Sequence, residues 1–410
     1  MLQTIYNISL IQMSLLTCYS LPALDLYKIK ISSVFFVWES NFKKSIMVQV
    51  SRTTKFTGIC IGVYVAYAVF IFFLMPLLMP DPVSLQRSIV AFKTRHLGDI
   101  SNYTMETGGT PIRSMLVTFR GSGALTLLDS LANQPGCYQH YAPLIAYGGR
   151  SAVEHQPAQV LKELEELYNC DYNSSMKMIQ WGKRSPIFRR FYGAQSKLCM
   201  TYSHDSCWDP DNLAAICKLH PFINMAVYNM KLKYLALLLD RKLNLRILLL
   251  VRDPRGTMYS RKNRNWCDGL KDCEASSLCM DMVSDFKMAQ ILREQYPDRF
   301  STIRYEDLAM HPAQGIKQVF EFYGIPLQRS KGRHRGIHPR SWINPENYDL
   351  DNAWGYSTHS AYEWMSKMRF DEIKAVQKVC VDAMDMWGYR QVEDFHNFSP
   401  KKFEPMLGKA

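Results

Sequence analysis

The chain has 410 residues, of which 47% are hydrophobic and 21% are charged, and its net charge is +12. This composition excludes a wholly disordered chain, and the modest content of Gly (21) and Cys (11) excludes collagen and small disulfide-stapled scaffolds. The positive charge favours anionic ligands, such as nucleotides, polyanionic glycans, nucleic acid or acidic lipid, without choosing among them.

Residues 56–80 form an uncharged, mostly apolar run that is long enough to span a membrane. A helix needs about 20 apolar residues to cross a bilayer core. Arg52 and Lys55 precede the run and Asp81 follows it, so the excess of positive charge predicts that residues 1–55 are a cytosolic extension. The sequence therefore predicts a single-pass type II protein with its C-terminal part across the membrane.

Residues 1–46 have three open interpretations. The stretch up to Leu24 is uncharged and fairly apolar but begins without basic residues. It fits a second membrane element, a poorly structured extension, or a segment upstream of initiation at Met47. We favour a dispensable extension.

Cysteines and glycosylation sequons after the apolar run indicate the secretory pathway. In an oxidising compartment the nine cysteines would tend to pair, and an odd number leaves at least one unpaired. They are Cys137, Cys170, Cys199, Cys207, Cys217, Cys267, Cys273, Cys279 and Cys380. The six-residue spacing of Cys267, Cys273 and Cys279 does not fit a zinc site and favours local disulfides. Asn102, Asn173 and Asn397 each begin an N-x-S/T sequon, which predicts a glycoprotein.

The remaining chain divides into a stem, one domain and a tail. Residues 81–110 are polar and weakly periodic, as expected of a lumenal stem, and 396–410 are expected to be a tail. Within 111–395, strands are expected at 114–119, 245–251 and 300–305, alternating with helices at 124–133, 157–168, 222–239, 275–295, 313–323 and 370–387. Such alternation predicts an α/β fold, a P-loop-like parallel sheet flanked by helices, whose ligands bind beyond the carboxyl ends of the strands.

A glycine-rich turn joins the first expected strand to the first helix of this domain. Backbone N–H groups of such a loop and of the first helical turn converge on one place, which suits a phosphate. The candidate binding residues are Arg120, Gly121, Ser122, Gly123, Ala124, Leu125 and Thr126. The lysine of a Walker A motif is missing, which disfavours ATP hydrolysis. An ordinary tight turn explains this loop about equally well when the loop is taken alone.

A second candidate phosphate site follows the apolar strand at 245–251. Arg252 stands at the carboxyl end of this strand, and a helix from about Gly256 would carry Ser260 back to the same edge. An arginine and a hydroxyl together suit a phosphate. Arg255 and Arg261 have the alternatives of solvation or a salt bridge, and Asp253 has the alternative of holding an arginine in place.

In order and spacing, the two loops, the IRYEDL segment at 303–308 and the FYGIP segment at 322–326 resemble the Golgi carbohydrate sulfotransferases. The nearest group is the galactose/N-acetylglucosamine/N-acetylgalactosamine 6-O-sulfotransferases, and the resemblance covers about 111–392, including Trp364. It implies a Golgi membrane protein with a lumenal catalytic domain, which moves a sulfuryl group from 3′-phosphoadenosine 5′-phosphosulfate to a glycan hydroxyl, with the 6-position expected and no metal required. Nucleic acid is disfavoured as a partner, and a homodimer is left open.

The resemblance also implies roles for residues. The loop at 120–126 would hold the 5′-phosphosulfate, and Arg252 with Ser260 would hold the 3′-phosphate. The IRYEDL segment would be mainly structural, with Asp307 as a helix N-cap. Family loops usually read Arg-Ser-Gly-Ser-Ser/Thr, so the hydroxyl expected at Ala124 is missing.

The predicted site also needs a general base for the acceptor hydroxyl. Ala142 stands where the family often has a glutamate that is a candidate base. His140 is then the candidate, because an imidazole can take a proton near neutral pH, although a structural histidine is the more common case. Glu154 and His155 are weaker candidates.

Several features leave other functions open. The basic segment 328–340 suits donor phosphates, an anionic glycan, or a solvated loop, and Trp342, Trp354 and Tyr356 suit sugar stacking or ordinary packing. Asp349-Leu-Asp351 is a D-x-D that a metal-dependent Golgi glycosyltransferase would use. Ala124 and Ala142 motivate a third alternative, a non-catalytic glycan- or nucleotide-binding protein.

Overall fold

A computed structural model describes residues 56–74, 78, 81–95, 97–185, 198–202, 205–262, 264–267, 269–326 and 360–408. The chain separates into two units, which divide between Asp81 and Pro82. The first unit contains the apolar helix Phe56–Leu74, which has a mean hydropathy of 2.2. This helix is long and apolar enough to cross a membrane, and it occupies most of the segment predicted to do so.

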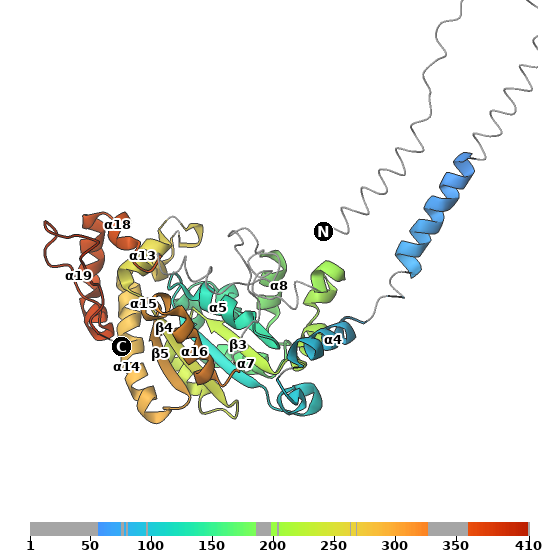
Figure 1. Ribbon diagram of the computed structural model, residues 1–410, viewed down its shortest axis with the longest axis horizontal. Helices are drawn as coiled ribbons and strands as arrows, with labels where there is room; N and C mark the ends of the chain where they lie inside the picture. Colours follow the sequence, from blue (N-terminus) through green and yellow to red (C-terminus); the bar gives the residue numbers. More distant parts are fainter. Residues whose placement is uncertain are drawn as a thin grey trace, which may run out of the picture. The chain divides into compact units, whose positions relative to one another are not determined.

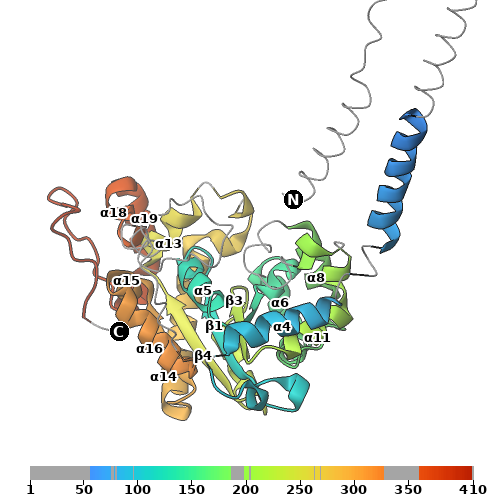
Figure 2. The same cartoon turned by 45° about the vertical axis from the view of Figure 1, so that its right-hand side comes forward.

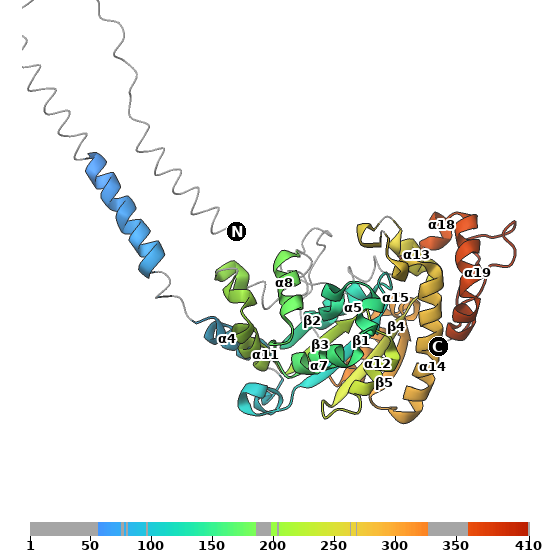
Figure 3. The same ribbon diagram turned by 180° about the vertical axis from the view of Figure 1, so that it is seen from behind.

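The second unit is built on a five-stranded parallel sheet with the strand order β2-β3-β1-β4-β5 (Figure 1). The strands are β1 (Ile112–Thr118), β2 (Cys137–Tyr141), β3 (Phe222–Val227), β4 (Leu245–Val251) and β5 (Phe300–Arg304). All four pairings are parallel. The central strands are almost completely buried, because helices lie on both faces of the sheet (Figures 1 and 3). This burial explains their continuous apolar runs and confirms the predicted fold class.

The longer helices are α4 (Pro82–Thr94), α5 (Ala124–Ala132), α7 (Pro157–Tyr168), α8 (Met176–Arg184), α11 (Pro210–Lys218), α13 (Pro254–Arg261), α14 (Ala275–Gln295), α16 (Pro312–Tyr323) and α19 (Phe370–Trp387). Short helices are α6 (Arg150–Glu154), α12 (Leu232–Leu235), α15 (Tyr305–Met310) and α18 (Trp364–Lys367). Most of the predicted helices are present with bounds within one or two residues. The long helices α14 and α19 pack side by side (Figure 1).

The predicted helix at 222–239 is wrong. Its first part is strand β3, which lies between β1 and β2, and only the short α12 and a single 3₁₀ turn follow. A strand buried on both faces has no alternation, so a continuous apolar run does not distinguish it from a buried helix. Strand β2 was not predicted either, because its five residues are too short to show a pattern.

Residues 82–110, expected to form a stem, fold against the domain instead. Helix α4 packs on α11 (Figure 2), with Val90 and Thr94 buried. Arg87 forms an ion pair with Glu106 that ties the helix to the following turn. At the other end, Met406 of the expected tail forms an isolated bridge with Tyr389.

Four disulfides link cysteines of the second unit: Cys170–Cys217, Cys199–Cys207, Cys267–Cys273 and Cys279–Cys380. Cys137 is left unpaired, as the odd count requires. The expectation of local pairing is confirmed for Cys267 and Cys273. Cys279 instead bonds Cys380 and so joins α14 to α19.

Candidate functional site

The two predicted phosphate loops meet at one edge of the sheet. Strands β1 and β4 are neighbours, with Thr118 opposite Leu250, so their carboxyl ends place the following loops side by side. The Nη1 of Arg252 donates a hydrogen bond of 3.0 Å to the carbonyl of Gly121. The structure thus brings the turn at 120–126 and Arg252 together.

Backbone geometry in the first loop requires glycine. Gly121 and Gly123 have φ values of +89° and +82°, a region that side chains with a Cβ rarely adopt. A Cβ at Gly123 would also overlap the ring of Tyr305. Gly123 is the N-cap of α5 and supplies no side-chain cap, so the first turn of this helix presents its N–H groups without one. Such an end favours a bound anion.

Side chains of the first loop divide between the interior and the surface. The buried hydroxyl of Ser122 accepts a hydrogen bond of 2.6 Å from Thr118 and so supports the turn. Ala124 is buried, whereas Leu125 is exposed and Thr126 is half-buried.

Arg252 has a buried donor group without a protein partner. The side chain is only 5% exposed, and its guanidinium carbon lies 4.6 Å from the centroid of the Tyr305 ring. Nη1 bonds Gly121 and Nη2 bonds the carbonyl of Ser360 at 2.6 Å, but Nε has no hydrogen-bond partner in the structure. Buried donors are nearly always satisfied, so this one calls for a ligand or a water.

Ser260 lies half-buried in the last turn of α13, on the helix that follows Arg252. Among the described residues no hydrogen bond joins its side chain to Arg252 or to the glycine loop. Ser260 is therefore placed near Arg252 only by the strand–turn–helix unit that carries both residues.

The other two arginines of this segment, Arg255 and Arg261, are buried and hydrogen-bonded within the protein. Arg255 is completely buried, bonds Asp253 at 2.7 Å, and has its guanidinium carbon 4.1 Å from the centroid of the Trp364 ring. Asp253 therefore holds an arginine in place, one of the alternatives for it. Arg261 donates to the carbonyls of Arg120 (2.8 Å) and Asp272 (2.9 Å), and burial lowers its pKa to about 10.

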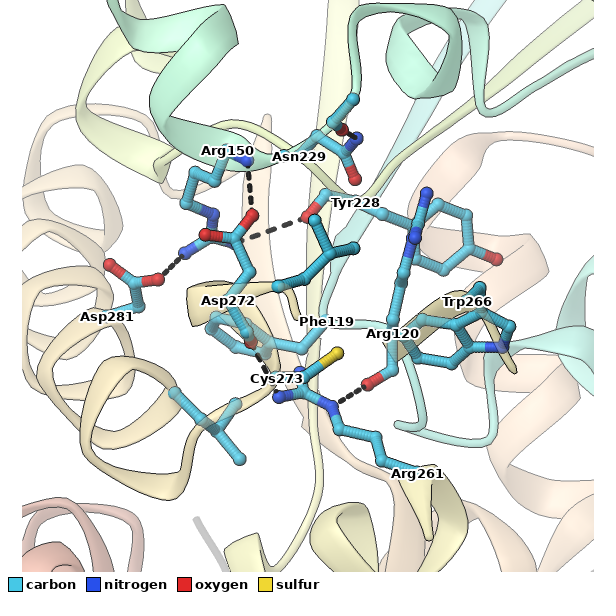
Figure 4. A pocket seen from close by; sticks show the side chains of 14 residues that line it. Phe119, Arg120, Arg150, Tyr228, Asn229, Arg261, Trp266, Asp272, Cys273 and Asp281 are labelled. Carbon is cyan, nitrogen blue, oxygen red and sulfur yellow. Dashed lines mark hydrogen bonds and ion pairs between the residues drawn. The ribbon is translucent and has the colours of Figure 1, made fainter. Parts of the chain in front are cut away.

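A cationic hollow lies beside the glycine loop (Figure 4). The space in it that a water molecule can occupy is about 30 Å³, and the hollow is partly open to solvent. Arg120, Arg150 and Arg261 line it together with Trp266 and Asp272. The Arg120 guanidinium carbon lies 5.0 Å from the centroid of the Trp266 ring, and burial lowers the pKa of Arg120. Three arginines around one hollow suit a transferred anionic group.

The IRYEDL segment supports this site from the neighbouring strand. Buried Glu306 accepts hydrogen bonds of 3.0 Å from the backbone N–H of Asp253 and from the hydroxyl of Tyr389. Burial, and next the Asp253 carboxylate, raise the pKa of Glu306 to about 7. Asp307 is not the predicted N-cap; Arg304 occupies that position and pairs with Asp307 at 2.8 Å. The supporting role was predicted, but the direct contacts of Tyr305 with Gly123 and Arg252 were missed.

His140 is wrongly placed to serve as a base. It lies in β2 with its side chain 0% exposed, and its ring centroid is 5.2 Å from that of Tyr138 and 5.8 Å from that of Tyr172. Burial lowers the pKa of His140 to about 3, so it stays neutral. A side chain enclosed in the core cannot contact an acceptor, and the sequence did not reveal that the segment after the first helix is a buried strand.

None of the other positions considered for the general base replaces His140. Ala142 is buried with φ +48° and carries no ionisable group. Glu154 forms an ion pair of 3.2 Å with Lys231, and exposed His155 does not line the hollow. Other sequence-predicted features lie outside the described residues: 328–340, Trp342, Asp349, Asp351, Trp354 and Tyr356.

Sequence similarity to known proteins covers most of the second unit. The family model described as "Sulfotransferase domain" matches residues 111–388. Carbohydrate sulfotransferase 1 of Danio rerio is 30% identical over 240 residues, which are 52% of this chain and 54% of that protein. Carbohydrate sulfotransferase 5 of Mus musculus is 27% identical over 227 residues, covering 50% of this chain and 52% of that protein. The chain spans about half or less of the length of the curated relatives it matches.

Among solved structures, the mouse sulfotransferase SULT7A1 complexed with PAP aligns with a TM-score of 0.33 and 12% identity. The alignment covers 70% of this chain and 89% of that chain.

Proposed function

Because this chain belongs to the sulfotransferase domain family, we propose that it transfers a sulfuryl group from 3′-phosphoadenosine 5′-phosphosulfate to a glycan hydroxyl. The expected acceptor position is the 6-hydroxyl of galactose, N-acetylglucosamine or N-acetylgalactosamine. One observation carries the proposal: the buried Arg252, with an unpaired donor, reaches the glycine loop at the shared edge of β1 and β4. Two anion sites in contact fit a donor that carries phosphate at both ends.

The residues present fit this donor. The N–H groups of the loop at 120–126 and of the first turn of α5 would hold the 5′-phosphosulfate. The free Nε of Arg252, with the hydroxyl of Ser260, would hold the 3′-phosphate. Tyr305 packs against both Gly123 and Arg252, so it would fix the distance between the two sites.

The chemistry resembles phosphoryl transfer, in which negative charge builds up on the departing group. Preorganised donors aimed at that charge lower the barrier. Here those donors are the loop N–H groups and the guanidinium of Arg120, which lines the hollow. Arg261 holds the Arg120 carbonyl and so keeps the loop in position before the reaction.

The proposed location is the Golgi membrane, with the domain in the lumen as a type II protein. The apolar helix Phe56–Leu74 and four disulfides support it. The sequon residues Asn102, Asn173 and Asn397 are all exposed and therefore open to glycosylation. A mobility shift on endoglycosidase treatment, lost when all three are changed to Gln, checks the lumenal placement.

The direct test is transfer of radiolabelled sulfate from the donor to a panel of glycans by the full chain. Calorimetry with adenosine 3′,5′-bisphosphate measures nucleotide binding in parallel. Transfer that disappears in Arg252→Ala supports the proposed function and begins to identify the acceptor. Binding without transfer to any glycan favours a non-catalytic nucleotide- or glycan-binding protein, and no binding contradicts the two-site assignment.

A further inference from the structure

The proposed transfer needs a group that takes the proton of the acceptor hydroxyl, and neither buried His140 nor Ala142 supplies one. We propose that Asp272 is this proton acceptor, an assignment that rests on the proposed sulfuryl transfer. Asp272 lies in a short 3₁₀ turn, Lys271–Cys273, on the wall of the cationic hollow.

The other ionisable groups on this wall are committed elsewhere. Asp281 forms ion pairs with Arg150 at 2.5 Å and with Lys231 at 3.5 Å, and its side chain is mostly buried. Burial raises the pKa of Tyr228 well above its ordinary value, so its hydroxyl keeps its proton. Cys273 is held in a disulfide. Among the described residues of the wall, Asp272 is the remaining carboxylate.

One guanidinium sets the position of Asp272 relative to the glycine loop. Arg261 donates from Nη1 to the Asp272 carbonyl at 2.9 Å and from Nε to the Arg120 carbonyl at 2.8 Å. In Figure 4, Asp272 lies on the Arg150 side of the hollow and Arg120 on the Trp266 side. The Cys267–Cys273 disulfide anchors the segment that carries Asp272. The carboxylate and the anion-binding loop therefore border the same space.

The carboxylate keeps unused acceptor capacity. Its Oδ2 accepts the backbone N–H of Arg150. A carboxylate offers about four lone-pair sites. In the described part of the chain no lysine or arginine side chain forms an ion pair with Asp272, although four charged side chains face it from the surrounding elements. They are Arg120, Arg150, Arg261 and Asp281.

The proposed step exchanges one bond to sulfur for another. The acceptor hydroxyl oxygen forms a bond to sulfur while its proton passes to a carboxylate oxygen of Asp272. The bond between sulfur and the bridging oxygen of the 5′-phosphate breaks, and that oxygen leaves with the electron pair. Adenosine 3′,5′-bisphosphate and the sulfated glycan are the products, and Asp272 later loses its proton to water.

The test compares Asp272→Asn with the wild-type full chain, using a glycan that the wild type sulfates. Asparagine keeps an oxygen for the Arg150 N–H, so the local structure is retained while the base is lost. We expect kcat to fall by about 10²- to 10⁴-fold. The affinity for adenosine 3′,5′-bisphosphate, measured by calorimetry, should change by less than about threefold, since Asp272 is assigned no contact with nucleotide phosphate.

The matched control is Glu274→Gln, the same chemical change at an exposed position two residues away, which should leave transfer unchanged. Transfer by Asp272→Asn within tenfold of wild type, or an equal loss of nucleotide affinity, overturns the assignment. If the wild type sulfates no glycan, the proposed function fails and the assignment fails with it.

Discussion

Arg252 shows how a single side chain joins two binding loops. Its Nη atoms hold the carbonyls of Gly121 and Ser360, which leaves Nε for the ligand. Lysine would keep the charge but not this planar fork. We therefore expect Arg252→Lys to weaken binding of adenosine 3′,5′-bisphosphate by about 10- to 150-fold, the range for one charged hydrogen bond. Calorimetry measures this loss, and affinity within threefold of wild type would show that Nε makes no contact with the nucleotide.

His140 is expected to affect acid stability rather than catalysis. Its pKa is lowered by burial from about 6.5 to about 3, so acidification through this range protonates the unfolded chain but not the folded one. Stability attributed to this residue is present above pH 6.5 and decreases at lower pH, by about 1.4 kcal/mol per pH unit. We expect His140→Phe to keep sulfate transfer within about threefold of wild type.

Denaturant unfolding of His140→Phe and of wild type at pH 5 and pH 7 provides the measurement. The variant should gain stability relative to wild type at the lower pH, because it lacks the buried imidazole. If the variant folds normally but loses sulfate transfer, His140 would again be a candidate catalytic residue.

At the level of residues, the sequence predicts binding residues whose position is set by the neighbouring residues of the chain. Gly121, Gly123 and Arg252 could be predicted because a strand, a turn and a helix follow one another directly. Arg261 and Asp272 could not, because their contacts depend on three-dimensional placement: Arg261 contacts the loop from α13, and Asp272 in the disulfide-bonded turn contacts Arg261. Nothing in their spacing indicates that contact.

At the level of elements, the carboxyl ends of β4 and β5 are joined through Glu306. This carboxyl accepts the N–H of Asp253, directly after Arg252, and its pKa of about 7 lies above the unfolded value of about 4.5. Between these values the folded chain keeps a proton that the unfolded chain releases. The associated stability is therefore full below pH 4.5 and is lost as the pH rises through 7.

We expect Glu306→Gln to remove this dependence on pH. Relative to wild type, the variant should become more stable between pH 5 and pH 8 by on the order of 1 kcal/mol per pH unit up to pH 7. The change with pH is the readout, since the substitution also alters the hydrogen bond from Tyr389 at every pH. The buried Asp285, whose pKa is raised to about 6, is common to both proteins and cancels in the comparison. A constant difference between them across this range would contradict the prediction.

Helices long enough to show a clear hydrophobic period could be predicted from the sequence. Strands that are recognised only by their pairing with neighbouring strands could not. Helices α14 and α19 have the predicted bounds because both are long. Strands β2 and β3 are short and enclosed, so only their pairing with β1 and with each other distinguishes them from helix or loop. Because β2 was not predicted, His140 was expected to lie after the first helix near the binding edge, whereas it lies in a buried strand, so an error in one element becomes an error in the site.

At the level of the whole molecule, the folded region begins before the family match. The match starts at residue 111, whereas the compact unit starts at Pro82. Thr94 is fully buried and packs closely over Gly136, where an added Cβ would lie 2.6 Å from its Cγ2. Residues 82–110 therefore cover part of the core next to β2 and cannot act as a free spacer.

Two secreted chains test this inference. The chain 82–410 should bind adenosine 3′,5′-bisphosphate and transfer sulfate as the full protein does, because its compact unit is complete. The chain 111–410 exposes the surface under α4, and loss of the burial of Val90 alone costs about 1.5–3 kcal/mol. We expect its Tm to fall by about 2–5 °C, since an unfolding entropy of about 2.1 cal/mol/K per residue makes 1 kcal/mol worth about 1.6 °C in a domain of about 300 residues. Equal Tm values for the two chains, measured by calorimetry, would mean that 82–110 is a stem after all.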